Sequence, residues 1–166
     1  MKFGEVQKVR LPAFTVIGKL GEGLATEGSS WVPPLWEAAN ARFDELGEVL
    51  EPDMLTDLQL WGLMSDTTAW LRPWQEVGYY LAGLAVPSDT PTPVDWYRWD
   101  MPAMEYLIVK TNSQELNTMT EKMLTEILPQ QGEELVAAIQ EYYEPDFEAG
   151  EVVLYFPTKI ITAKED

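Results

Sequence analysis

The spacing of apolar side chains along the chain predicts alternating strands and helices. Apolar residues recur at steps of three and four over 35–50, which is the period of an amphipathic helix. A second stretch with the same period covers 116–128 and stops at Pro129. Runs of β-branched, aromatic or other apolar residues predict a first strand signal over 6–19, interrupted at 11–13, and further strands at 58–64, 78–86, 104–109, 138–143 and 151–157.

Two of these stretches carry a further prediction. The run over 78–86 is apolar at both odd and even positions, which is typical of a central strand that is covered on both faces. The segment after the first strand contains four closely spaced glycines and is expected to be a flexible loop. The spacing of these glycines does not match a phosphate-binding loop. They are Gly18, Gly21, Gly23 and Gly28.

A short motif occurs twice and indicates an internal repeat. The segment 11–14 reads Leu-Pro-Ala-Phe and the segment 101–104 reads Met-Pro-Ala-Met. Each begins a predicted strand, helix, strand, strand unit, so duplication is the better interpretation. We expect one domain over 1–166, with repeats at about 5–87 and 96–160 joined by a proline-rich linker over 87–95. The predicted class is α+β, with helices on one face of antiparallel sheets and a ligand groove on the other.

The composition of the chain indicates a domain with a sizeable core and no membrane span. The chain has 166 residues, 46% of them hydrophobic, which is ample for one unaided core. No segment approaches the roughly 20 consecutive apolar residues of a membrane span. The first residues contain no apolar stretch of signal-peptide length, so we expect a cytoplasmic protein without membrane contact.

The charged and reactive residues exclude several classes of function. Eleven Lys and Arg stand against 28 Asp and Glu, a net charge of −17 without a basic cluster, so direct nucleic-acid binding is not expected. A negative field would instead attract a cationic small molecule. The chain has neither Cys nor His, which excludes disulfides, zinc-thiolate sites and a Ser-His-Asp triad. We predict no metal and no cofactor.

Two carboxylates occupy strand positions where apolar residues are expected. Glu141 shares its predicted strand face with Ile139 and Tyr143, and Glu105 shares its face with Leu107. A buried carboxylate needs a partner, a raised pKa or a ligand, although a strand-end Glu can also reach water. Seven Trp and seven Tyr are many for this length. A cleft of such rings with a carboxylate at its floor suits flat organic cations, while ordinary packing is the alternative for each ring.

Several segments, in their order and spacing, are similar to the GyrI-like small-molecule-binding domain, which is also the effector domain of drug-sensing transcription activators. These segments are 33–36, 79–86, 101–106, 141–143 and 152–157. The resemblance extends over about 6–159 and implies two pseudo-symmetric units around a ligand groove. It also implies a Glu-x-Tyr pair whose carboxylate meets cationic, aromatic ligands, a pattern that falls on Glu141 and Tyr143.

The favoured hypothesis is therefore a binding domain for a hydrophobic, aromatic, cationic small molecule. The first alternative is a hydrolase that opens strained cyclopropane rings of DNA-alkylating natural products, with Glu141, or less favourably Glu105, as the catalytic carboxylate. The second alternative is an acidic protein that modulates gyrase. The predicted ligand-binding residues are Glu141, Tyr143, Trp36, Trp61, Trp70, Tyr80 and Tyr106.

Overall fold

The computed structural model describes residues 1–50, 59–144 and 150–161 and has the predicted α+β class. Its eight strands form one antiparallel sheet with the order β1-β6-β8-β7-β3-β4-β2-β5. The strands are β1 (Val6–Leu11), β2 (Phe14–Leu24), β3 (Leu60–Asp66), β4 (Val77–Val86), β5 (Tyr97–Met101), β6 (Met104–Asn112), β7 (Gln140–Tyr143) and β8 (Glu151–Ile160).

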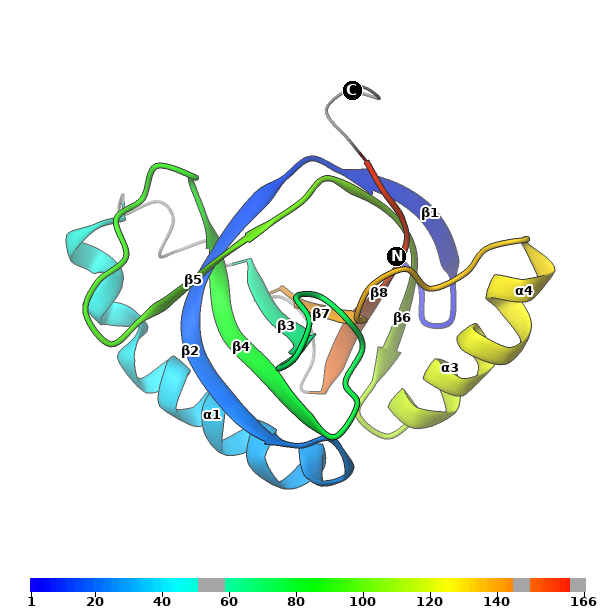
Figure 1. Cartoon of the computed structure of the whole chain (residues 1–166), viewed down its shortest axis with the longest axis horizontal. Helices are drawn as coiled ribbons and strands as arrows, with labels where there is room; N and C mark the ends of the chain where they lie inside the picture. The colour runs from blue at the N-terminus through cyan, green and yellow to red at the C-terminus, as the bar shows by residue number, and fades with distance from the viewer. Residues whose placement is uncertain (51–58, 145–149, 162–166) are drawn as a thin grey trace.

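The repeated motif forms the corner at which the sheet bends. Leu11 pairs with Met104 and Phe14 pairs with Met101, so β1–β6 and β2–β5 share one register across the two Pro-Ala segments. β1 and β2 thus act as one long bent strand, and β5 and β6 as another. Each bend falls at a proline, which lacks the N–H that a continuous ladder needs. The strands consequently curve into a ring, with the two motifs side by side (Figure 1).

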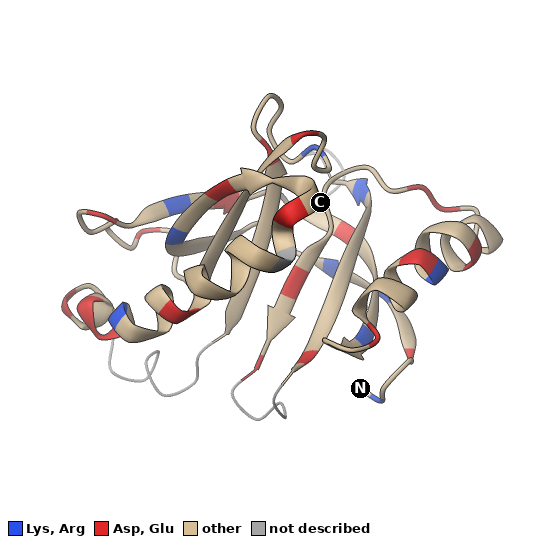
Figure 2. Ribbon diagram, turned by 90° about the horizontal axis from the view of Figure 1, so that it is seen from below, with Lys and Arg blue, Asp and Glu red and all other residues tan. Residues whose placement is uncertain are grey.

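Both helical segments pack on the same face of this curved sheet. α1 (Gly28–Arg42) follows a short 3-10 turn η1 (Ala25–Glu27) and continues into a 3-10 turn η2 (Phe43–Glu48). The second segment comprises α3 (Leu116–Lys122), a π-helical turn η3 (Met123–Ile127) and α4 (Leu128–Gln130). Both lie outside the ring of strands (Figures 1 and 2). We call this helix-bearing side the outer face and the enclosed side the inner face.

The predicted apolar stripes are the surfaces by which the helices pack. Ala39, Phe43 and Leu46 are buried in one cluster with outward-facing residues of β2 and β4. Met123 and Leu128 are buried in a second cluster with outward-facing residues of β6 and β8. Each helix therefore covers one half of the outer face. The second helix includes Pro129 in its final turn rather than ending before it, because a proline is tolerated in the first turn of α4.

Three of the four glycines, Gly18, Gly21 and Gly23, lie in β2 and Gly28 begins α1, so the predicted flexible loop is wrong. Gly18 pairs with Gly83 of β4, and a Cβ on Gly18 would lie 2.4 Å from the Ala82 carbonyl oxygen. A Cβ on Gly23 would come within 2.6 Å of the Trp31 ring, which packs on the strand from α1. The glycines permit close approach of neighbouring backbone and of a tryptophan. A glycine-rich composition is also typical of loops, and for this reason the sequence pattern predicted a loop here.

The other predicted strands are present, with shifted bounds. β4 lies between β3 and β2 and alternates buried residues toward both faces, as expected of a central strand. The predicted start of β3 at Leu58 lies outside the described residues. The division of the domain into repeats over 5–87 and 96–160 stays a prediction. Among the described residues, no helix has the length and apolar character that crossing a membrane requires.

The acidic residues are spread over helices, strands and loops of the described chain (Figure 2). Lys and Arg are few and gather on no single element in that view. The negative charge of the described chain is thus not confined to one element.

Candidate functional site

Glu141 is at the centre of a buried polar cluster on the outer face. It lies on β7, between β3 and β8, and its side chain is only 8% exposed. Its Oε1 accepts hydrogen bonds from the hydroxyl of Tyr80 at 2.5 Å and from that of Tyr143 at 3.1 Å. The Tyr80 hydroxyl accepts a further bond from Trp36 Nε1 at 2.8 Å. Four residues from α1, β4 and β7 therefore form one connected network.

A glycine on the intervening strand makes this network possible. Gly62 of β3 pairs with Glu141 of β7 on one side and with Ala82 of β4 on the other. A Cβ on Gly62 would lie 1.8 Å from the Tyr80 hydroxyl oxygen and 2.9 Å from Glu141 Oε1. Tyr80 therefore reaches the carboxylate across β3 only because position 62 has no side chain. In the sequence, Gly62 is a single glycine within an apolar run. This signal was too weak to mark it as part of the site.

Gln140 fixes the strand that carries the carboxylate. Its Oε1 accepts a bond from the Met64 N–H at 2.6 Å, and its Nε2 donates to the Ala138 carbonyl at 3.0 Å. Gln140 is fully buried, and successive side chains of a strand point to opposite faces. With Gln140 bound to β3, Glu141 is directed to the outer face.

The electrostatics of the cluster oppose ionisation of its acid. Burial raises the pKa of Glu141, and the hydrogen bonds from Tyr80 and Tyr143 offset only part of this effect. Burial, together with the neighbouring carboxylate, raises the pKa of both tyrosines. No Lys or Arg of the described chain bonds to Glu141. Nor do the described residues include a group of three acidic side chains that could hold a metal ion.

Aromatic rings cover the carboxylate from the helix side. The Trp36 ring lies 5.4 Å from the Tyr143 ring and 6.3 Å from the Tyr80 ring, edge-on to both. Trp36 is supplied by α1, over one half of the sheet, and Tyr143 also packs in the apolar cluster of the other half. Aromatic surface thus bridges the two helix-covered halves above Glu141.

The structure separates the predicted ligand-binding residues into two groups. Trp36, Tyr80, Glu141 and Tyr143 come together on the outer face. The other three, Trp61, Trp70 and Tyr106, lie on the inner face. Trp61 packs against Tyr142 at 4.7 Å between ring centroids, and the Tyr106 hydroxyl is buried without a hydrogen-bond partner in the described chain. The strand period of two produces this separation.

The second carboxylate candidate has a different environment. Glu105 is half-buried on β6, and the register places it opposite Arg10 of β1 and Lys159 of β8. It therefore has basic cross-strand neighbours, which Glu141 lacks. No described contact links Glu105 to the Glu141 cluster.

The predicted groove and the predicted carboxylate lie on different faces. Two hollows, of about 760 and about 350 Å³, are formed by residues of the inner face and of the loop between β3 and β4. Glu141 lines neither of them and faces the helices. The sequence predicted one site, a groove opposite the helices with a carboxylate at its floor. In the structure the hollows are on the inner face, whereas the carboxylate of Glu141 is on the outer face.

Comparison with known proteins gives a family and a fold. A family model described as "GyrI-like small molecule binding domain" matches residues 4–161. No protein with a curated description matches the chain.

Three solved structures share the fold, each at 12% sequence identity. An integron cassette protein from the mobile metagenome of Vibrio cholerae has a TM-score of 0.62, with 94% of this chain and 96% of that chain covered. SAV2435 bound to tetraphenylphosphonium also has a TM-score of 0.62, with coverage of 93% and 94%. The C-terminal domain of EcmrR has a TM-score of 0.58, with coverage of 96% and 100%.

Proposed function

The chain belongs to the GyrI-like small molecule binding domain family, and we propose that its ligand is a hydrophobic, aromatic cation held at Glu141. The binding of small molecules follows from the family. The positive charge and the role of the carboxylate are inferred from the outer-face cluster.

The observation that carries this proposal is a buried carboxylate that has no cationic partner among residues 1–50, 59–144 and 150–161. Buried charges in proteins are normally paired, because removing an unpaired carboxylate from water is costly. Within the described chain, Glu141 has only the hydroxyls of Tyr80 and Tyr143 as hydrogen-bond partners. A ligand cation would supply the missing charge and relieve the cost of burial. Glu141 would then serve to bind the ligand and not to stabilise the fold.

The surroundings of the carboxylate favour an aromatic ligand over a small ion. Trp36, Tyr80 and Tyr143 present ring surface next to Glu141, and such rings attract organic cations through their π-systems. The net charge of −17 raises the local concentration of any cation. The solved complex of SAV2435 with tetraphenylphosphonium supports this ligand class by analogy of fold alone.

The ligand must displace part of the aromatic cover to reach the acid. Trp36 is half-buried, and it follows directly after Pro33, Pro34 and Leu35 in α1. The two prolines lie inside the helix and lack the N–H groups that would bond to the preceding turn. We infer that this weakened part of α1 allows the Trp36 ring to move aside.

The test replaces the charge of the carboxylate and keeps its shape. Glu141→Gln retains an oxygen that accepts from both tyrosines. A desolvated charge-assisted contact is worth about 1.5–3 kcal/mol, so affinity for tetraphenylphosphonium should fall about ten- to a hundredfold. Affinity for neutral triphenylphosphine oxide should change by less than about threefold. Isothermal titration calorimetry measures both.

Glu144→Gln is the matched control, because Glu144 is exposed and lies three positions along the same segment. It removes the same charge from the overall field and should leave both affinities nearly unchanged. The stability of Glu141→Gln should hold or rise. If that variant binds both compounds as before and melts several degrees lower, Glu141 has a structural role and the cation proposal is wrong.

A further inference from the structure

The inner face holds a hollow that the Glu141 cluster does not use. Its volume is about 760 Å³, within the range of about 300–1,000 Å³ that small-molecule sites occupy. Three of the large apolar side chains most exposed to solvent converge on it: Trp70 is 55% exposed, Val136 46% and Ile160 45%. Exposed apolar groups that gather around one concavity indicate a binding surface rather than chance exposure.

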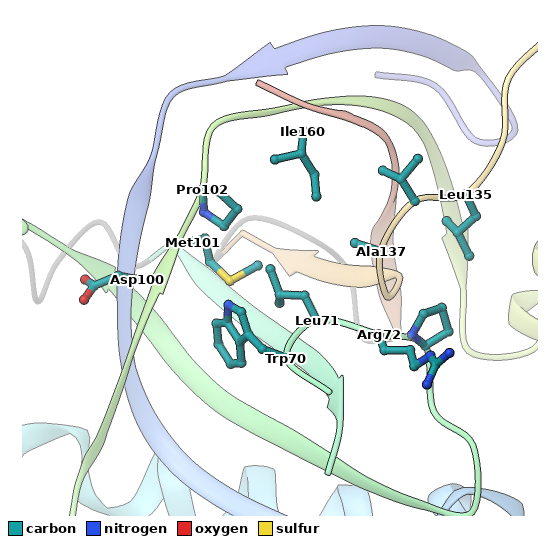
Figure 3. Close-up of a pocket in the computed structure, with 11 residues that line it drawn as sticks. Trp70, Leu71, Arg72, Asp100, Met101, Pro102, Leu135, Ala137 and Ile160 are labelled. Atoms are coloured by element: carbon teal, nitrogen blue, oxygen red, sulfur yellow. The ribbon is translucent and has the colours of Figure 1, made fainter. Parts of the chain in front are cut away.

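The buried walls of the hollow are apolar, and of its two charged lining residues Arg72 is exposed to solvent. Leu71, Met101 and Ala137 are buried along its walls. The Asp100 carboxylate is directed away from it (Figure 3) and accepts bonds from Thr15 Oγ1 at 2.7 Å and Arg98 Nε at 3.1 Å. A charged ligand would find no counter-ion against the buried walls. An uncharged hydrophobic molecule would bind favourably, because apolar surface of the ligand and of the hollow would be removed from water.

The backbone that forms this hollow is held in an unusual conformation. Leu71 has a φ of 64°, in the left-handed region that bulky residues avoid. Its N–H donates to Ser65 Oγ at 2.7 Å, and its carbonyl accepts from the Ala138 N–H at 2.6 Å. These bonds tie the β3–β4 loop to the segment before β7. Trp70 is thereby held at the rim, edge-on to Trp99 with 4.8 Å between ring centroids.

We propose that this inner-face hollow is a second small-molecule site, which binds an uncharged hydrophobic molecule against Trp70 and Ile160. It is independent of the proposed cation site. Trp61 and Leu63 of β3 point to the inner face, while Gly62 between them adjoins Glu141 on the outer face. The two sites therefore lie on opposite faces of the sheet and share no described lining residue.

The experiment uses Nile red, an uncharged dye whose fluorescence rises in apolar surroundings. Trp70→Ala removes the exposed ring, and Ile160→Gln places an amide at the rim without disturbing the buried walls. Each should weaken dye binding about tenfold or more, because aromatic contact area and apolar character are lost.

Two control variants are matched by exposure and lie outside the hollow. Tyr97→Ala removes a ring that is 51% exposed, and Leu24→Gln introduces an amide at a position that is 47% exposed. Both should bind Nile red as the unaltered chain does. Cooperative thermal unfolding of all variants confirms that a lost signal reflects the site and not the fold.

Three outcomes would overturn this second site. The first is unchanged dye binding in both Trp70→Ala and Ile160→Gln. The second is loss of dye binding in Glu141→Gln but not in the Trp70 variant, which would place the dye on the outer face. The third is a dimer in sedimentation that excludes the dye and dissociates in Trp70→Ala, because a second copy of the chain would then cover the hollow. Failure of the cation titration alone leaves this site unaffected.

Discussion

The outer-face cluster and the inner-face hollow use similar residues in opposite ways. Around Glu141, the polar atoms point toward one another and form hydrogen bonds, and the carboxylate is buried beneath Trp36. Around Trp70, apolar groups turn inward while Asp100 turns away to Thr15 and Arg98, and the space stays open. Both regions contain tryptophan and nearby carboxylates. Residue composition alone therefore does not distinguish the two proposed sites. The direction of each polar group does.

The largest effect that separates the two regions should come from Gly62→Ala. Its Cβ would overlap the Tyr80 hydroxyl, so the network must rearrange, at a cost of about 2–3 kcal/mol in the free energy of unfolding. Tetraphenylphosphonium binding should be lost, while Nile red binding on the inner face should persist. Urea unfolding and the two titrations measure this. Loss of both ligands together would mean that the two regions are not separable.

A pair of tyrosine substitutions sharpens the contrast between satisfied and unsatisfied hydroxyls. Tyr80→Phe removes the acceptor of Trp36 Nε1 and one of the two hydroxyl donors to Glu141, and should lower the free energy of unfolding by about 1.5–2 kcal/mol. Tyr106→Phe removes a buried hydroxyl with no partner in the described chain, and should be neutral or slightly stabilising. Denaturant unfolding of both variants tests the expectation. Equal losses would show that the hydroxyl networks do not distinguish the faces.

The pH dependence of ligand binding should also differ between the two regions. A cation favours ionised Glu141, whose pKa is raised above 4.5 by burial. Affinity for tetraphenylphosphonium should therefore rise with pH, by up to about tenfold per pH unit, until the folded-state pKa is passed, and then level off. Nile red binding should be flat over the same range. Calorimetric titrations between pH 4.5 and 8 provide the curve.

The stability of the protein should change with pH in the opposite direction. Because the folded state holds the Glu141 proton more tightly than the unfolded state, this group stabilises the fold most below pH 4.5. That contribution is lost as pH rises through the folded-state pKa. Glu141→Gln should lack this decline. A parallel pH profile in both proteins would contradict the raised pKa.

Much of the fold could be predicted from local pattern. The two apolar stripes became α1 with η2 and α3 with α4, and the doubly apolar run became the central strand β4. The glycine-rich end of β2 was the main error, because local composition cannot reveal that a Trp31 ring and a neighbouring strand lie within 3 Å of a missing Cβ. These close contacts form between neighbouring strands and between helix and sheet, so they are set by the tertiary structure.

The candidate site could be predicted only in part. Glu141 stood out because a carboxylate interrupted an apolar strand face, and its pairing with Tyr143 follows from the strand period of two. Tyr80 and Trp36 were expected near a ligand, although nothing local showed that they would bond to each other. Gly62 was not identified, since its importance depends on a tyrosine that reaches over it from the next strand.

The sequence by itself determined the class of the elements, the acidic surface and the absence of imidazole and thiol chemistry. These are properties of short-range periodicity and of composition, which no folding event can change. Only the tertiary structure decided which aromatic residues meet Glu141 and which line the inner hollow. The ring-like curvature of the sheet and the register of β3 against β7 set those distances, and both depend on contacts between residues far apart in the chain.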